Sequence, residues 1–123
     1  MDKPTFKVII AGGRDFNDYE LLREKCDKYL SSKLLTHSIV ILSGSARGAD
    51  SLGERYAAEH NFQIQRFPAN WEKDGKCAGF LRNKQMAEAA DALVAFWDGR
   101  SRGTGHMISL ARMRNLQVRI VSY

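Results

Sequence analysis

Short apolar segments alternate with amphipathic segments along the whole chain, and this order constrains the fold more than any other feature. The apolar segments are predicted as strands, at residues 6–11, 38–42, 62–67, 92–97 and 118–121. The amphipathic segments are predicted as helices, one capped by Asn17 or Asp18 and the others over residues 47–60, 79–90 and 104–114. Residues 69–78, which include Trp71, are predicted as a polar loop.

This regular alternation predicts a mostly parallel sheet, because each crossover between parallel strands places a helix on one face of the sheet. We therefore expect residues 1–123 to form a single α/β domain, a Rossmann-like three-layer sandwich of about five strands with helices on both faces. Ligands of such sheets bind beyond the carboxyl ends of the strands, where the strand order reverses. The loops after the strands are therefore the segments in which to seek a site.

Glycine, small hydroxyl residues and arginine are concentrated in these loops. A glycine-rich turn that opens a helix exposes unpaired N–H groups and the positive end of the helix dipole, and both attract anions. Hydroxyl donors from Ser43, Ser45, Ser101 and Thr104 and the nearby arginines fit phosphate. The residues predicted to bind a phosphorylated ligand are Gly12, Gly13, Arg14, Gly44, Ser45, Arg47, Gly48, Arg82, Asn83, Gly103 and Thr104.

Each of these features also has a purely structural interpretation. The Gly12-Gly13 pair is equally typical of a tight turn. Asp50 is equally typical of a residue that caps a helix or pairs with an arginine. Both Trp71 and the other tryptophan, Trp97, are compatible with packing and with ligand stacking. His106 lies one turn into the last predicted helix, and the sequence leaves open whether it contacts the ligand. The stronger argument is that four such loops are predicted on one edge of the sheet.

Composition narrows the class of protein. No apolar run approaches the length of a membrane helix and no signal-like segment is visible, so we expect a cytoplasmic protein without a membrane partner. Cys26 and Cys77 lie far apart without a CxxC or Cys/His grouping, which predicts free thiols and no metal site. The net charge of +5 favours an anionic partner. The arginines lie in glycine-rich loops rather than along a helix, which favours a compact anion over nucleic acid.

The motifs, in this order, resemble the cpYpsA-related branch of the SLOG superfamily. The resemblance spans residues 8–120 and rests on Gly-Gly-Arg-Asp-Phe at 12–16, Gly-Ser-Ala-Arg-Gly-Ala-Asp at 44–50, Pro-Ala-Asn-Trp at 68–71, Arg82-Asn83 and Gly103-Thr104. It implies a Rossmannoid fold and a site for a nucleotide or a nucleotide derivative, with phosphate at Gly103 and Thr104. The wider superfamily includes Lonely Guy phosphoribohydrolases, molybdenum-cofactor carrier proteins and the DNA-uptake protein DprA.

One departure from the Lonely Guy enzymes bears on catalysis. Their pattern Gly-Gly-x-Gly-Thr-x-x-Glu supplies a glutamate for N-glycosidic cleavage, whereas this chain has Met107 at that position and Ser101 in place of one glycine. A methionine side chain neither donates a proton nor stabilises an oxocarbenium ion. The sequence therefore favours binding or sensing of a phosphorylated nucleotide-type ligand, with no certain cofactor.

Two other functions remain open. An N-glycosidic hydrolase resembling the phosphoribohydrolases would need a catalytic group, and the candidates are Asp15, Asp50, Arg82 and His106, with Asp98 as a further carboxylate. Nucleic-acid binding is the third hypothesis. A monomer and a homo-oligomer are both compatible with the half-exposed strand predicted at residues 62–67.

Overall fold

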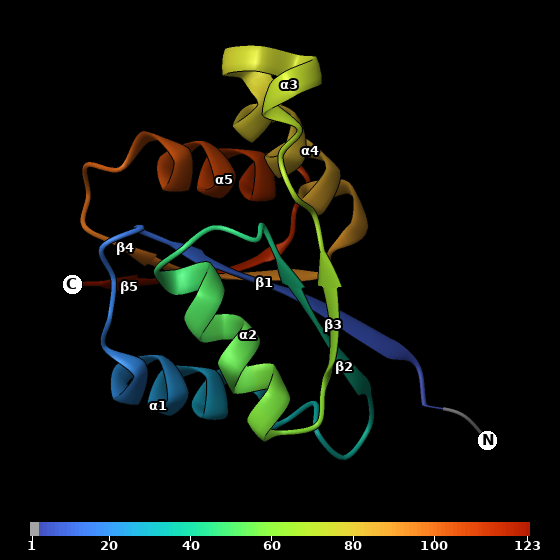
Figure 1. Cartoon of the computed structure of the whole chain (residues 1–123). Coiled ribbons are helices and arrows are strands. Elements are labelled where there is room, and N and C mark those ends of the chain that lie inside the picture. Colours follow the sequence, from blue (N-terminus) through green and yellow to red (C-terminus); the bar gives the residue numbers. More distant parts are fainter. Residues whose placement is uncertain (1–2) are drawn as a thin grey trace.

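The five strands form one parallel sheet in the order β3-β2-β1-β4-β5 (Figure 1). The computed structural model of the chain describes residues 3–123. The strands are β1 (Thr5–Gly12), β2 (Ser38–Ser43), β3 (Gln63–Arg66), β4 (Ala92–Trp97) and β5 (Gln117–Ser122). In the register of the sheet, Ile9 of β1 pairs with Leu42 of β2 and with Leu93 of β4. Apolar side chains of these three central strands therefore lie next to one another on each face of the sheet. The α/β Rossmann-like fold expected from the sequence is confirmed.

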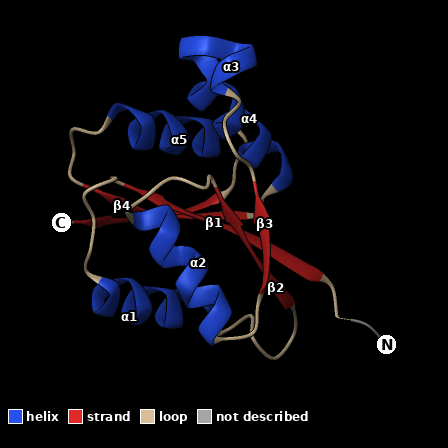
Figure 2. Cartoon of the chain, viewed as in Figure 1, coloured by secondary structure: helices blue, strands red, loops and turns tan. Residues whose placement is uncertain are grey.

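Helices cover both faces of the sheet (Figure 2). One face is covered by α1 (Tyr19–Leu30) and α2 (Ala49–Glu59), and the other by α4 (Ala78–Ala89) and α5 (Arg102–Met113). A short helix α3 (Trp71–Asp74) and a 3₁₀ turn, Gly75–Cys77, stand above α4. Within residues 3–123 no helix has both the length and the apolar character that a membrane crossing requires.

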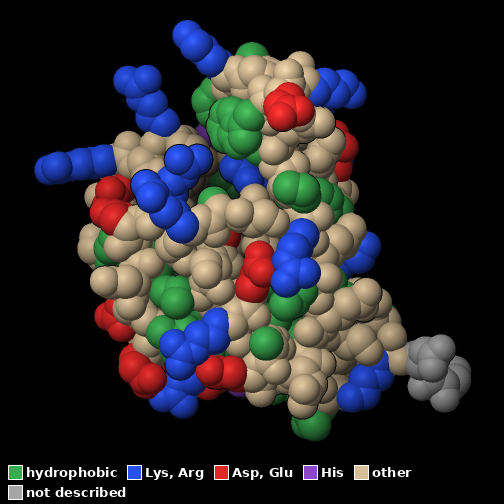
Figure 3. Space-filling model, in the orientation of Figure 1, with side chains coloured by type: hydrophobic (Ala, Val, Ile, Leu, Met, Phe, Trp, Pro, Cys, Tyr) green, Lys and Arg blue, Asp and Glu red, His purple; other side chains and the backbone are tan. Residues whose placement is uncertain are grey.

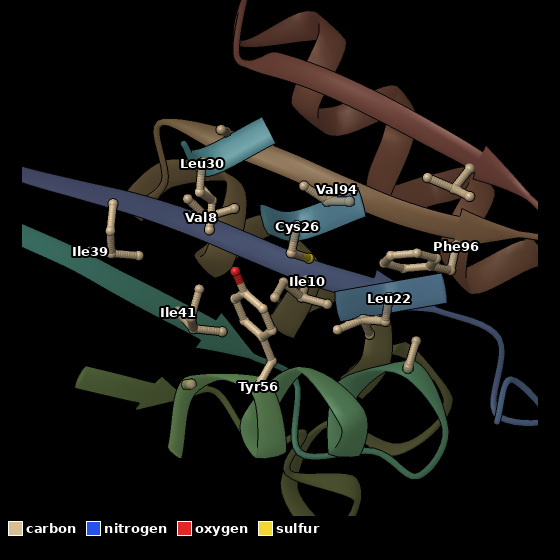
Figure 4. Packing of buried hydrophobic residues seen from close by; sticks show 14 of the residues in the cluster. Val8, Ile10, Leu22, Cys26, Leu30, Ile39, Ile41, Tyr56, Val94 and Phe96 are labelled. Atoms are coloured by element: carbon tan, nitrogen blue, oxygen red, sulfur yellow. The ribbon is translucent and has the colours of Figure 1, made fainter. Parts of the chain in front are cut away.

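Two apolar clusters hold the layers together, one on each face of the sheet. On the first face, Val8 and Ile10 of β1 pack against Leu22 of α1 and Tyr56 of α2, all nearly or fully buried (Figure 4). On the second face, Ile9 packs with residues of α4 and α5. Each fully buried aliphatic or aromatic side chain stabilises the fold by about 1.5–3 kcal/mol, so packing against the sheet stabilises both helix layers.

The structure corrects three local predictions. Residues 69–78 are mostly helical, because Asn70 accepts a hydrogen bond from the Lys73 N–H (3.1 Å) and thereby caps α3. Thr104 does not cap α5, which begins two residues earlier with Ser101 at its N-cap. Strand β3 is shorter than predicted and pairs only with β2, at the edge of the sheet. Of the two candidate caps for α1, Asp18 is the one used, accepting from the Leu21 N–H (3.1 Å).

Candidate functional site

A large cavity lies at the carboxyl ends of β1 and β4, where the strand order reverses. From β1 the chain continues to β2 and β3 on one side and later returns to β4 on the other, so the loops after β1 and β4 diverge and leave a crevice. The cavity measures about 710 Å³, within the usual range for ligand sites of about 300–1,000 Å³. Its lining is Ala11, Gly12, Gly13, Arg14, Asp15, Ala46, Arg47, Asp50, Arg82, Asn83, Met86, Asp98, Ser101, Gly103, Thr104 and Met107.

The first turn of α5 forms one wall of this cavity, through Ser101, Gly103 and Thr104. The side chain of its N-cap, Ser101, accepts no hydrogen bond from a backbone N–H of the helix, unlike that of α1, and instead pairs with the Thr104 hydroxyl (3.3 Å). The loop before it is fixed by Asp98, whose Oδ1 accepts from the N–H groups of Ser101 and Arg100 (both 2.8 Å). These bonds hold the pKa of Asp98 below its usual range. Uncapped N–H groups at the positive end of a helix dipole suit an anion.

Three arginines line the cavity: Arg14, Arg47 and Arg82. The first two are exposed, whereas Arg82 is partly buried and is fixed by its surroundings. Its Nη1 donates to the Gly44 carbonyl oxygen and its Nε to Asn83 Oδ1 (3.0 Å). In Figure 3, Lys and Arg side chains project from the part of the surface where α5 begins. Positive charge is therefore present both at the floor and at the rim of the cavity.

Asp50 lies at the floor of the cavity, at the start of α2, and is 7% exposed. Its Oδ2 accepts from the Ala46 N–H (3.2 Å). Burial raises the pKa of Asp50 to about 6, although the Ala46 N–H and the nearby Arg82 charge oppose the shift. Burial also lowers the pKa of Arg82, and the carboxylate of Asp50 counteracts this. Asp50 and Arg82 thus place a carboxyl group with a pKa of about 6 beside a guanidinium group, in a cavity that a ligand can enter.

Glycines let the loops after β1 and β2 meet. Gly48 has φ +79°, and a Cβ there would overlap the Gly13 carbonyl oxygen and lie 2.7 Å from Arg14 Cα. The Ala49 N–H donates to the same Gly13 oxygen (3.2 Å). At Gly44 a Cβ would lie 2.7 Å from Arg82 Nη1 and 2.8 Å from Asp50 Oδ2. Gly48 therefore supports the floor without lining it, and Gly44 leaves room for the buried charges.

A second hollow, the side compartment, adjoins the cavity and measures about 310 Å³. Its walls include the two predicted ligand residues Gly44 and Ser45 and the segment that leads into α3. The residues that line both hollows are Arg14, Ala46, Arg47 and Arg82, and those that line only the side compartment are Gly44, Ser45, Pro68, Ala69 and Trp71. The two hollows thus share a wall that carries three arginines.

The structure separates the sequence candidates into those that reach the cavity and those that do not. Asp15, Asp50 and Arg82 line it, but His106 does not. Its Nδ1 lies 3.3 Å from Asn83 Nδ2, and its ring packs 4.5 Å from that of Phe80. Burial lowers the pKa of His106. The Asn83 amide N–H donates this hydrogen bond, so Nδ1 is the acceptor and carries no proton, and His106 serves to orient Asn83 rather than to contact the cavity.

One predicted hydroxyl donor, Ser43, has other partners. The Ser43 hydroxyl is buried and donates to Glu54 Oε2 (2.6 Å), while it accepts from the Ser45 N–H (3.1 Å). Glu54 is in turn paired with Arg66 of β3 (2.9 Å). Ser43 therefore shapes the loop after β2 and does not line either hollow. Ser45, with φ +61°, stays at the wall of the side compartment.

Sequence reasoning missed contacts made between distant segments. Tyr123 donates its hydroxyl to Asp15 Oδ1 (2.6 Å), which ties the end of β5 to the loop after β1. Met86 lines the cavity from α4, as Met107 does from α5. No local pattern marks the contact of Tyr123, because it depends on which loops the sheet brings together. Within residues 3–123, no group of three or more His, Cys, Asp or Glu side chains is arranged to hold a metal ion.

Comparisons with known proteins agree with this architecture. Residues 6–73 match YAcAr, described as the YspA, cpYpsA-related SLOG family. Gene 61 protein of Mycobacterium phage D29 is 34% identical over 118 residues, covering 91% of this chain and 93% of that protein.

Two solved structures share the fold at low sequence identity. DNA processing protein A of Helicobacter pylori, from a study of its single-stranded DNA binding mode, superposes with a TM-score of 0.65 at 17% identity. That match covers 94% of this chain and 64% of the other, so this chain spans less than two thirds of it. The structural-genomics target TM1055 superposes with a TM-score of 0.61 at 19% identity, over 94% and 72% of the two chains. The family match and the phage relative together show that this chain belongs to the YspA, cpYpsA-related SLOG family.

Proposed function

We propose that this protein binds or senses a nucleotide or a nucleotide-derived phosphorylated ligand in the cavity at the carboxyl ends of β1 and β4. The observation that carries the proposal is the convergence of an uncapped helix start and three arginines on one 710 Å³ cavity at the switch point of the sheet. Guanidinium groups bind phosphate in bidentate fashion, and the N–H groups of α5 add further donors. A phosphate therefore has partners on two sides of the cavity.

Asp50 suits the sugar of such a ligand. Its carboxyl group lies on the floor beside Arg82, and only one hydrogen bond to it, from the Ala46 N–H, is found within residues 3–123. A carboxylate with free lone pairs accepts hydrogen bonds from ribose hydroxyls, as an acidic residue does in dinucleotide sites. The phosphate would then lie toward α5 and the arginines, and the sugar above α2.

Thermal unfolding with a panel of ligands tests this proposal. We expect AMP, GMP, CMP, UMP, ADP or ADP-ribose to raise the melting temperature, because a ligand at 100 times its Kd stabilises by about 2.7 kcal/mol. Arg47→Ala should abolish the shift without unfolding the protein, since Arg47 is exposed and has no ion pair within residues 3–123. Gly103→Asp should do the same by charge repulsion, because a side chain at that position enters open space.

The control is Arg112→Ala, which removes the same charge from the opposite end of α5. It should leave every shift intact. A panel that gives no shift with the wild-type protein, or shifts that survive both Arg47→Ala and Gly103→Asp, would refute the proposed site. A single-stranded oligonucleotide belongs in the same assay, because the net charge of +5 also suits nucleic acid. Steeply salt-dependent oligonucleotide binding without any mononucleotide shift would support nucleic-acid binding instead.

The buried carboxyl group of Asp50 favours one second function, N-glycosidic hydrolysis of the bound nucleotide. Burial brings its pKa to about 6, close to the range in which a carboxyl group serves as a general acid or base. Met107, which lines the same cavity, lacks any such chemistry. Chromatography of nucleoside monophosphates incubated with the protein would detect released base. Release that disappears in Asp50→Asn would establish the activity, and none across the panel would exclude it for those substrates.

A further inference from the structure

We propose that the side compartment is the subsite for the aromatic base of the ligand, and that Trp71 is the platform on which the base stacks. This inference rests on the proposed function, because it assigns a place to the base of the nucleotide. The compartment of about 310 Å³ opens from the cavity across the wall formed by Arg14, Arg47 and Arg82. A ligand whose phosphate binds this wall can therefore place its sugar in the cavity and its base in the side compartment.

Trp71 lies at the wall of the side compartment, and no structural role explains its position there. It is 52% exposed and belongs to neither apolar cluster. Within residues 3–123 its indole N–H has no hydrogen-bond acceptor, and its ring has no aromatic or cationic partner. Trp97 differs on each point, because it packs against the second cluster and its Nε1 donates to the Ser101 carbonyl oxygen (3.0 Å). A half-exposed tryptophan at the wall of a hollow suits a ligand better than a core.

The backbone around Trp71 fixes where its ring lies. Asn70 caps α3 and also accepts, through its carbonyl oxygen, from the Asp74 N–H (2.9 Å). The ring edge reaches the first turn of α4 at Gly79, where a Cβ would lie 3.5 Å from Trp71 Cη2 and 3.7 Å from Arg82 Nη2. The tryptophan ring and the guanidinium group thus approach the same point. A phosphate on Arg82 and a base on Trp71 are therefore compatible with one ligand.

The chemistry of the compartment indicates how the base would be recognised. The residues that line it alone are glycine, serine, proline, alanine and tryptophan, with no carboxylate or amide side chain to match base edges. Recognition by a ring face depends on stacking area rather than on hydrogen bonds, and every base has such a face. The subsite should therefore accept different bases and favour purines over pyrimidines.

Calorimetric titration with AMP and with ribose 5-phosphate tests the inference, because the two probes share the phosphate and ribose and AMP carries adenine in place of the hydroxyl at C1. Stacking of a base on an aromatic side chain is equivalent to about a 5- to 150-fold change in Kd. We expect wild-type protein to bind AMP more tightly than ribose 5-phosphate by such a factor. Trp71→Leu should remove this advantage and leave the Kd for ribose 5-phosphate unchanged, whereas Trp71→Phe should retain much of it. The control is Leu35→Ala, which truncates an exposed apolar side chain outside both hollows.

The possible outcomes distinguish this inference from the function on which it rests. Equal affinity of the wild-type protein for AMP and ribose 5-phosphate, or an AMP affinity that Trp71→Leu does not change, overturns the base subsite while the phosphate site stands. Loss of both probes in Trp71→Leu, with a folded protein, also overturns it, because the residue would then act on the phosphate site. If no phosphorylated ligand binds the wild-type protein at all, the proposed function and the subsite both fail.

Discussion

Gly48→Ala should be among the most destabilising single-methyl additions to this protein, because it acts on the contact between the loops after β1 and β2. The backbone at Gly48 has φ +79° and ψ −128°, a conformation that costs a residue with a Cβ about 1–3 kcal/mol. The added methyl group would also overlap the Gly13 carbonyl oxygen and lie 2.7 Å from Arg14 Cα. Backbone atoms do not move aside as a flexible side chain does, so a further overpacking cost of about 1–3 kcal/mol applies.

Gly75→Ala separates the two contributions. Gly75 has nearly the same conformation, φ +57° and ψ −136°, but a Cβ there meets no atom within 4 Å. We expect Gly75→Ala to cost about 1–3 kcal/mol and Gly48→Ala about 2–6 kcal/mol. At this chain length, 1 kcal/mol corresponds to roughly 4 °C in melting temperature. Urea unfolding followed by circular dichroism measures both losses.

The ligand response gives a second measurement of the same perturbation. Because Gly48 holds the loop that carries Arg47 against the loop that carries Arg14, the alanine variant should lose the nucleotide-induced shift at temperatures where it is still folded. Equal costs for Gly48→Ala and Gly75→Ala would show that the loops are not in the close contact described, and would refute the reasoning.

Three further predictions concern stability. Burial raises the pKa of Asp50 to about 6, above its unfolded value of about 3.9, so its protonation stabilises the fold as pH falls from above 6 to 4. Relative to Asp50→Asn, the wild-type protein should gain about 2–3 kcal/mol between pH 7.5 and pH 4 in urea unfolding, and parallel pH profiles would contradict this. Gly53→Ala should cost about 1–3 kcal/mol despite the higher helix propensity of alanine, because its Cβ would lie 2.8 Å from Ile10 Cγ2. Gly79→Ala, whose Cβ has no neighbour nearer than 3.5 Å, should be neutral or stabilising by the same assay.

Sequence alone determined the order of the elements and the edge on which to seek a site. Burial of the central strands on both faces leaves a local signature, a continuous apolar run, as in β4 (Ala92–Trp97), whose bounds were predicted without error. Helix ends also have local signals, and Asp18 was among the predicted caps of α1. The helical turn at Trp71–Asp74 was missed because it is too short to show a helical periodicity. Its local feature is the single capping bond from the Lys73 N–H to Asn70.

Only the tertiary structure decided what each candidate side chain does. Ser43 and Asn83 are both buried polar residues with protein partners, yet Asn83 lines the cavity and Ser43 does not. His106 lies one turn into the helix that opens on the cavity and still points its Nδ1 at Asn83. The bond between Tyr123 and Asp15 joins residues 108 positions apart. Periodicity and capping are properties of neighbouring residues and can be read along the chain, whereas the partner of a polar group depends on which distant segments the sheet order brings to the same edge.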